Sequence, residues 1–182
     1  MPTEIEFRGP LTQIEFDKLL IFLRKEADFV KRMKRKTFVF ETNDKTSDLK
    51  ARTTDGVDEI VLKKGFWGAR KREEIVIPLK TNSIEEAVRL FSLLGYNKGI
   101  IAIRDNYIFN YKNIEFAMVE CPNDYCFYEA EFIRNNEIEN PEKHIKEVLK
   151  SLNLIVWSEK EVYDFMIYCK KNIDEHFEYK KF

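Results

Sequence analysis

Charged side chains at alternate positions of short strand-like segments are the feature that most constrains this chain. One such segment is Glu4-Ile5-Glu6-Phe7-Arg8, and a second, Phe127-Tyr128-Glu129-Ala130-Glu131, follows far along the sequence. Because successive side chains of a strand point to opposite faces, each segment places its charges in one row. Carboxylate pairs bind hard divalent cations, and rows of Lys or Arg bind phosphate. A barrel with such rows turned inward would hold a metal-bound polyphosphate.

Segments between these two carry cations with the same spacing. Lys50 and Arg52 share one strand face, and Arg70 and Arg72 share another. Each row also has a simpler interpretation, because the solvent face of an amphipathic edge strand shows the same alternation. For an arbitrary sequence this solvent-facing arrangement is the better interpretation.

Composition limits the class of protein. The 182 residues suffice for one domain with a sizeable core, and we expect a single domain over residues 1–182. The net charge of -1 argues against specific nucleic-acid binding, and the 15 Phe residues argue against disorder. We interpret the three cysteines as thiols of a reducing compartment. With no signal-peptide run and no membrane-length apolar segment, we expect a cytoplasmic protein without membrane contact.

Helix caps and hydrophobic periodicity predict the secondary structure. Helices are expected after Thr12 (with Glu15, through Val30), after Ser83 (with Glu86, stopping at Gly95), from Asn140-Pro141, and after Ser158 (with Glu161). Strands are expected at 3–8, 36–41, 47–53, 58–64, 70–78, 98–104, 106–111, 113–119 and 125–133, with a hairpin at Asp55-Gly56. The basic cluster between Lys31 and Lys36 is expected to be a solvated turn, with anion contact as the alternative. Short connections favour antiparallel pairing in an α+β domain.

In this order and spacing the segments resemble the CYTH domain family. This family comprises class IV adenylate cyclases and thiamine triphosphatases and is also called the triphosphate tunnel metalloenzymes. Its E-x-E-x-K motif corresponds to Glu4 through Arg8, with Arg8 in place of Lys, and its F-x-E-x-E motif to Phe127 through Glu131. Further matches are Leu49-Lys50-Ala51-Arg52, Ile60 through Lys63, Arg72-Glu73-Glu74, Leu94-Gly95-Tyr96 and Arg104 through Tyr107. The resemblance covers nearly the whole chain.

The resemblance implies a fold and a site. The fold is an antiparallel β tunnel barrel of about eight strands with peripheral helices. The tunnel would bind a triphosphate-containing small molecule through Arg8, Lys50, Arg52, Lys63, Arg72 and Arg104. Mg²⁺ or Mn²⁺ would be held by Glu4, Glu6, Glu129 and Glu131, with Glu74 as a further candidate.

The activity expected first is metal-dependent hydrolysis of an inorganic or organic triphosphate. The alternatives are a class IV adenylate cyclase and a non-catalytic binder of nucleotide or polyphosphate. Three departures from the family pattern bear on this choice: Ala102 replaces a Lys, Ala117 replaces an Asp, and Arg8 does not readily give up its proton as Lys would. A homodimer is left open.

Overall fold

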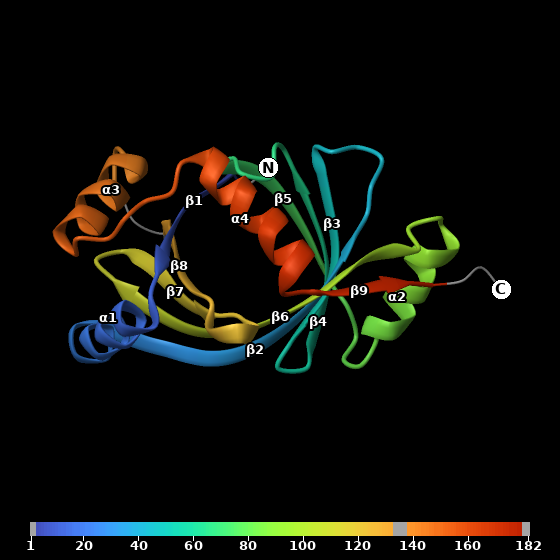
Figure 1. Ribbon diagram of the computed structural model, residues 1–182, viewed down its shortest axis with the longest axis horizontal. Helices are drawn as coiled ribbons and strands as arrows, with labels where there is room; N and C mark the ends of the chain where they lie inside the picture. The colour runs from blue at the N-terminus through green and yellow to red at the C-terminus, as the bar shows by residue number, and fades with distance from the viewer. Residues whose placement is uncertain (1–2, 133–137, 180–182) are drawn as a thin grey trace.

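The computed structural model describes residues 3–132 and 138–179, with the side chains of residues 3 and 4 left out (Figure 1). The strands are β1 (Thr3–Leu11), β2 (Asp28–Phe40), β3 (Ser47–Thr54), β4 (Val57–Lys64), β5 (Lys71–Pro78), β6 (Lys98–Tyr111), β7 (Ile114–Glu120), β8 (Cys126–Phe132) and β9 (Glu175–Glu178). The helices are α1 (Gln13–Glu26), α2 (Ile84–Leu93), α3 (Pro141–Ser151) and α4 (Glu159–Asn172), with a short 3-10 turn at Pro122–Asp124.

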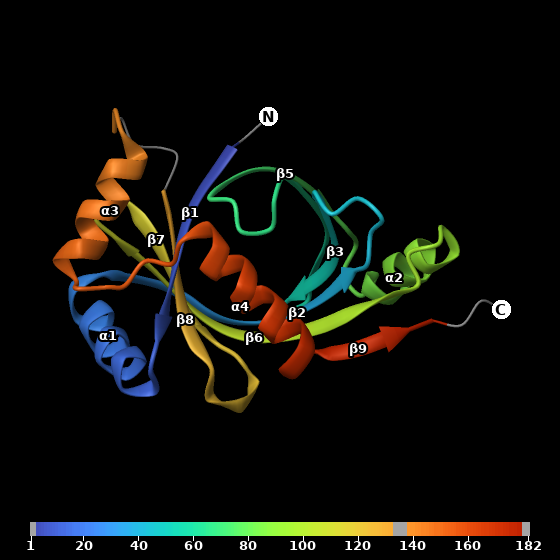
Figure 2. The ribbon, with the colours of Figure 1, turned by 45° about the horizontal axis from the view of Figure 1, so that its top comes forward.

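Eight of these strands close into an antiparallel barrel. Their order is β2-β3-β4-β5-β1-β8-β7-β6, and β6 pairs back with β2 from Gly99 to Asn110. Strand β9 extends the sheet by pairing with the first residues of β6. Figure 2 shows the strands curving around a common axis, with α1, α2 and α3 on the outside and α4 lying across one side. The prediction of an α+β tunnel barrel is confirmed.

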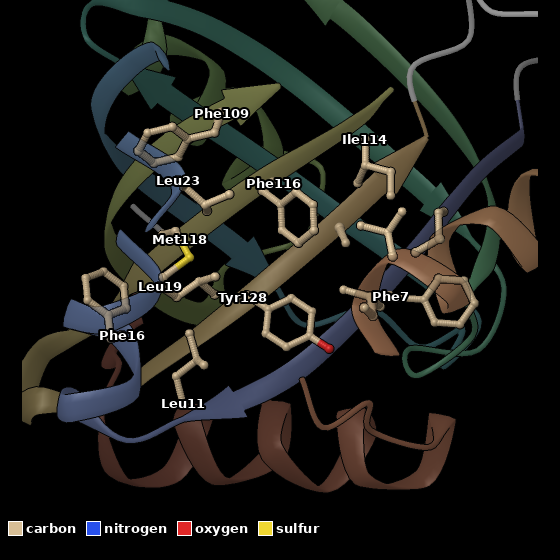
Figure 3. Packing of buried hydrophobic residues seen from close by; sticks show 14 of the residues in the cluster. Phe7, Leu11, Phe16, Leu19, Leu23, Phe109, Ile114, Phe116, Met118 and Tyr128 are labelled. Atoms are coloured by element: carbon tan, nitrogen blue, oxygen red, sulfur yellow. The ribbon is translucent and has the colours of Figure 1, made fainter. Parts of the chain in front are cut away.

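The main hydrophobic core lies outside the barrel. Phe7 of β1 and Tyr128 of β8 turn outward, with exposed fractions of 1% and 0%, and pack with Phe16 and Leu23 of α1 and Leu149 of α3 (Figure 3). On the same strands the charged residues alternate with these apolar ones and point inward. The sequence alternation therefore reads as apolar outside and charged inside, the reverse of a barrel with an apolar centre.

Two smaller clusters attach the other helices. Ala87 and Val88 of α2 pack on the outer faces of β2 and β3, next to Phe38 and Ala51. A third cluster centres on Val119 of β7 and Phe127 of β8, with Phe165 of α4 packed against it. This contact holds α4 against the barrel wall.

The predicted helix starts are confirmed, but one cap is wrong. Thr12 and Ser158 form the expected capping boxes, and Asn140 accepts a hydrogen bond from the backbone N–H of Lys143. Ser83 forms no such box. Instead Oδ2 of the buried Asp58 accepts hydrogen bonds from the N–H groups of Ser83 and Ile84, at 2.7 and 3.0 Å. A carboxylate supplied by β4 satisfies the amides at the positive end of α2, so a local box is not needed.

The extent of strand β2 is the largest correction to the sequence interpretation. The first helix ends at Glu26 rather than near Val30, and β2 begins at Asp28. The cluster from Lys31 to Lys36, expected as a turn, lies within this strand. Pairing with β6 along nearly its whole length overrides the polar local composition.

Two further strands differ from the prediction, and one predicted hairpin agrees with it. The predicted strands 98–104 and 106–111 form one continuous strand, β6. Strand β9 is an addition to the predicted set, because the pattern after α4 carries no strand signal. The Asp55-Gly56 hairpin is confirmed, with φ values of 48° and 85° typical of the favoured two-residue turn.

Candidate functional site

A charged cavity of about 370 Å³ lies inside the barrel. All eight barrel strands contribute to it, and α4 covers part of it through Val162, Phe165 and Met166. Of the predicted site residues, the cavity is lined by Glu6, Arg8, Lys50, Arg52, Lys63, Glu74, Arg104, Glu129 and Glu131. Alternation along each strand, together with closure of the sheet, brings these residues together.

The other two predicted site residues are Glu4 and Arg72. The side chain of Glu4 lies outside the described part of the structure, and the backbone of Glu4 pairs with Arg72 of β5. Arg72 is 7% exposed and sits behind the cavity lining, where its guanidinium donates to Oδ2 of Asp48 at 3.2 and 3.3 Å. Arg72 therefore influences the cavity indirectly, by pairing with Asp48, which lines it.

Arg8 organises the carboxylates of β1 and β8. Its Nε donates to Oε1 of Glu129 at 2.7 Å, and its Nη2 donates to both carboxylate oxygens of Glu6 at 2.8 Å. Burial opposes ionisation of Glu129, but the Arg8 guanidinium outweighs burial and lowers the pKa of Glu129 to about 2. Glu129 is thus held in the charged form, and Glu6 hydrogen bonds to the same arginine.

This arrangement bears on the predicted metal site. Carboxylate oxygens are suitable donors for Mg²⁺ or Mn²⁺, and Glu6, Glu129 and Glu131 share one wall of the cavity. Among the residues described, however, no three His, Cys, Asp or Glu side chains are grouped to hold a metal ion. The guanidinium of Arg8 bridges the two carboxylates that a metal would need. The described side chains as arranged do not fit a resident divalent cation, and the metal set stays a prediction.

On the opposite wall, Asp48 holds two cations. Its Oδ2 lies 2.7 Å from Nζ of Lys50 and 3.2 Å from Nη2 of Arg72, and its side chain is fully buried. Burial would raise the pKa of Asp48, but Lys50 and Arg72 together lower it. The sequence analysis missed Asp48, although its place two residues before Lys50 puts both on one strand face.

Among the described residues, the remaining cavity cations have carboxylate partners of their own, with one exception. Arg52 pairs with Glu59 at 2.7 Å, Lys63 with Glu74 at 3.7 Å, and Arg104 with the almost buried Asp174 at 2.8 Å. Arg35, the exception, is a cavity residue that sequence reasoning missed. Its Nε donates to Oγ1 of Thr54 at 3.2 Å.

Arg70 was expected to share a face with Arg72, and that expectation is wrong. Strand β5 begins only at Lys71, so alternation does not extend back to Arg70. The Arg70 guanidinium lies on the outside, 4.8 Å from the ring centre of Phe7, and donates to the carbonyl of Trp157 at 3.2 Å. Arg70 stabilises the contact between β1 and the segment before α4.

The two alanines that depart from the family pattern both line the cavity. Ala102 pairs with Thr37 across β6 and β2, and Ala117 pairs with Glu129 across β7 and β8. Apolar side chains occupy another part of the lining, including Trp67, Phe127 and Phe165. The cavity therefore combines charged walls with an apolar side.

Comparisons with known proteins agree with this fold. No family model matches the sequence, and no curated protein matches it. Solved structures do match. The PH1012 protein from Pyrococcus horikoshii aligns with a TM-score of 0.71 and 21% identity, over 85% of this chain and 94% of that one. The Hippeastrum protein HpAC1, a candidate adenylyl cyclase described as having a dominant triphosphatase activity, aligns with a TM-score of 0.59 and 16% identity, over 91% and 96%.

A neighbour that belongs to a multiprotein module has the same fold. A chain of the Schizosaccharomyces pombe Mediator head module aligns with a TM-score of 0.66 and 12% identity, over 85% of this chain and 98% of that one. At these identities the comparisons show the fold alone. The chain has the tunnel-barrel fold expected from its resemblance to CYTH domains, and this fold alone does not define an activity.

Proposed function

We propose that this chain binds a triphosphate inside its barrel and processes it. The observation that carries the proposal is the convergence of Lys50, Arg52, Lys63 and Arg104 on one cavity inside the barrel from β3, β4 and β6. A chain of phosphates presents several negative charges in a row, and a set of fixed cations around a tunnel matches that pattern. Triphosphate chemistry in the fold neighbour HpAC1 supports the same class of ligand.

Binding would proceed by exchange of ion pairs. In the structure, carboxylates such as Asp48, Glu59 and Asp174 neutralise the cavity cations. A triphosphate would compete with these carboxylates for the same guanidinium and ammonium groups. The barrel already positions these donor groups, so binding changes their partners rather than their positions.

Hydrolysis is the reaction that we propose first. Phosphoryl transfer needs neutralised charge and in-line positioning more than covalent catalysis, and a cationic tunnel supplies both. A divalent cation enters this proposal as part of the substrate, a magnesium or manganese complex of the triphosphate. The carboxylates of Glu6, Glu129 and Glu131 then face the bound complex from β1 and β8. No covalent nucleophile is required of the protein.

A non-catalytic binder is the second candidate, and specific observations favour it. Arg8 engages both Glu6 and Glu129, and Ala117 brings no carboxylate to the wall beside Glu129. If this ion-paired arrangement persists in the bound state, the cavity holds a polyphosphate without activating water. A cyclase, the third candidate, would use the same triphosphate contacts but activate the ribose hydroxyl.

Phosphorus NMR separates these functions. The protein would be incubated with tripolyphosphate, ATP or thiamine triphosphate, each with and without Mg²⁺ or Mn²⁺. Release of orthophosphate is the expected result. Pyrophosphate together with cyclic AMP would indicate a cyclase, calorimetric binding without turnover would indicate a binder, and no binding of any triphosphate would refute the proposal.

Carboxylate variants test the metal prediction directly. Glu6→Gln and Glu129→Gln keep the side-chain shape but remove charge, so metal-dependent turnover should be lost while circular dichroism is unchanged. Glu147→Gln on the exposed face of α3 is the matched control. Unchanged metal dependence in both cavity variants would remove these residues from the site.

A further inference from the structure

Arg35 stands out among the cavity cations by its position. It lies on β2, where its backbone pairs with Arg104 of β6 on one side and with Thr54 of β3 on the other. Two residues further along, Thr37 pairs with Arg52 and with Ala102. Arg35 therefore lies in the middle of three adjacent strands that carry arginines on the same inward face.

Arg35 also differs from its neighbours in its contacts. Within residues 3–132 and 138–179, every other Arg or Lys lining the cavity forms an ion pair, whereas Arg35 hydrogen bonds to the neutral hydroxyl of Thr54. Its neighbours on the strand, Lys34 and Lys36, are exposed on the outer face.

The surroundings of the Arg35 guanidinium disfavour its positive charge. Burial lowers the pKa of Arg35, and repulsion from Arg52 lowers it further, with only partial compensation from Glu129, Glu59 and Glu74. Like charges on directly paired residues, here Arg35 and Arg104, also destabilise a sheet. A half-buried charge without an ion pair among the described residues is expected where a ligand supplies one.

We infer that Arg35 is a phosphate-binding residue of the tunnel and completes an anion site with Arg52 and Arg104. This inference rests on the proposed function and names a contact that the sequence motifs do not include. Arg35 supplies a cation near Ala102, the cavity position at which the CYTH motif has a lysine. Its ligand is one phosphoryl group of the bound chain, held by the planar fork of the guanidinium.

The test uses Arg35→Gln, with Lys34→Gln as the matched control on the outer face of the same strand. Calorimetric titrations with orthophosphate, pyrophosphate and tripolyphosphate would be run on both variants and on the wild type, and thermal unfolding would be followed with and without tripolyphosphate. We expect Arg35→Gln to weaken tripolyphosphate binding by about ten- to a hundredfold. Without ligand, the variant should unfold at a higher temperature, by about 2–4 °C, because a repulsive charge has been removed.

The opposite signs of these two effects distinguish a ligand contact from a structural role. If Arg35→Gln binds tripolyphosphate as tightly as the wild type, the inference is wrong while the proposed function stands. If the wild type binds orthophosphate or pyrophosphate but not tripolyphosphate, and Arg35→Gln loses that binding, the proposed function fails and the anion site stands. Absence of binding to all three anions would overturn both. An equal loss of tripolyphosphate affinity in Lys34→Gln would also overturn the inference. Such a loss would reflect the overall charge of the protein and not a specific contact.

Discussion

The two walls of the tunnel balance their charges in opposite ways. On the β1 and β8 wall, the carboxylates of Glu6 and Glu129 share a single arginine, Arg8. On the β2, β3 and β6 wall, arginines outnumber their local partners, and Arg35 has no ion pair among the described residues. The first wall gathers its carboxylates around one arginine, whereas the second places an arginine without an ion pair among the described residues where an anion could bind.

This difference gives the tunnel a direction. A metal–triphosphate complex carries both signs, so it would place its phosphates against the arginine wall and its cation toward the carboxylate wall. The internal ion pairs keep the cavity lining close to neutral, which limits the free-energy cost of burying so many charges. Charges paired within the protein are compatible with the folded state, whereas the Arg35 guanidinium, without an ion pair among the described residues, marks a position where a ligand anion would bind.

Removal of Arg8 should have the largest effect on stability. Arg8→Gln leaves Glu6 and Glu129 as partly buried carboxylates that repel each other. We expect the free energy of unfolding to fall by about 3 kcal/mol, since breaking buried pairs typically costs about 3–5 kcal/mol and these groups are partly exposed. Urea unfolding at neutral pH would measure this change.

The same variant sharpens the metal question. With Arg8 removed, Mg²⁺ or Mn²⁺ should restore part of the lost stability by binding the two carboxylates. Lys25→Gln, which removes an exposed cation beside Glu26, is the control and should change stability by less than about 0.5 kcal/mol. A loss below about 1 kcal/mol in Arg8→Gln would show that this wall does not depend on the arginine.

Acid should weaken the carboxylate wall next. The pKa of Glu129 is lowered from 4.5 to about 2 in the folded protein. Below pH 4.5 Glu129 is protonated in the unfolded chain but still ionised in the folded protein. The free energy of unfolding therefore falls as the pH drops from 4.5 towards 2. This group accounts for at most about 3 kcal/mol. Unfolding followed from about pH 5.5 to about pH 2.5 should show a shallower decline in Arg8→Gln than in the wild type, and parallel declines would contradict the assignment.

Much of this arrangement follows from the sequence, for a simple physical reason. Alternation along a strand fixes which residues share a face, so the amino-acid order by itself groups Glu6 with Arg8, Lys50 with Arg52, and Glu129 with Glu131. The hairpin at Asp55-Gly56 is equally readable from its residue types.

The rest depends on pairing between distant strands. Arg35 falls in a segment predicted as a turn, because its neighbours are polar and only the long ladder with β6 makes β2 a strand. The partnership of Arg8 with Glu129 spans 121 positions and is fixed by the β1–β8 register. Asp174 reaches Arg104 from beyond α4, where the sequence carries no signal.

Lys63 and Lys64 of β4 provide an internal test of phosphate binding inside the cavity. Lys63 lines the cavity, with its side chain 11% exposed, whereas the adjacent Lys64 points outward and pairs with Asp44. Lys63→Gln should weaken tripolyphosphate binding by about tenfold or more, the value of one charge-assisted contact. Lys64→Gln should leave binding unchanged. Calorimetric titration at fixed salt would decide, and equal effects of the two variants would place the phosphate outside the tunnel.

The smallest expected effect comes from adding a cation at Ala102. Ala102 faces the cavity beside Thr37, so a lysine there would reach the same region as the Arg35 guanidinium. In the wild type we expect Ala102→Lys to tighten tripolyphosphate binding by less than about tenfold, because Arg35 already supplies charge nearby and the added lysine is repelled by it.

In the Arg35→Gln background the same substitution should have a larger effect and recover most of the lost affinity. Calorimetry on the wild type, both single variants and the double variant forms a cycle that isolates the coupling between the two positions. Ala102→Asn, similar in polarity but uncharged, is the control for side-chain volume. Independent, additive effects would mean that the two residues contact different parts of the ligand. Recovery by lysine but not by asparagine would show that the tunnel needs one cation in this region and accepts it from either β2 or β6.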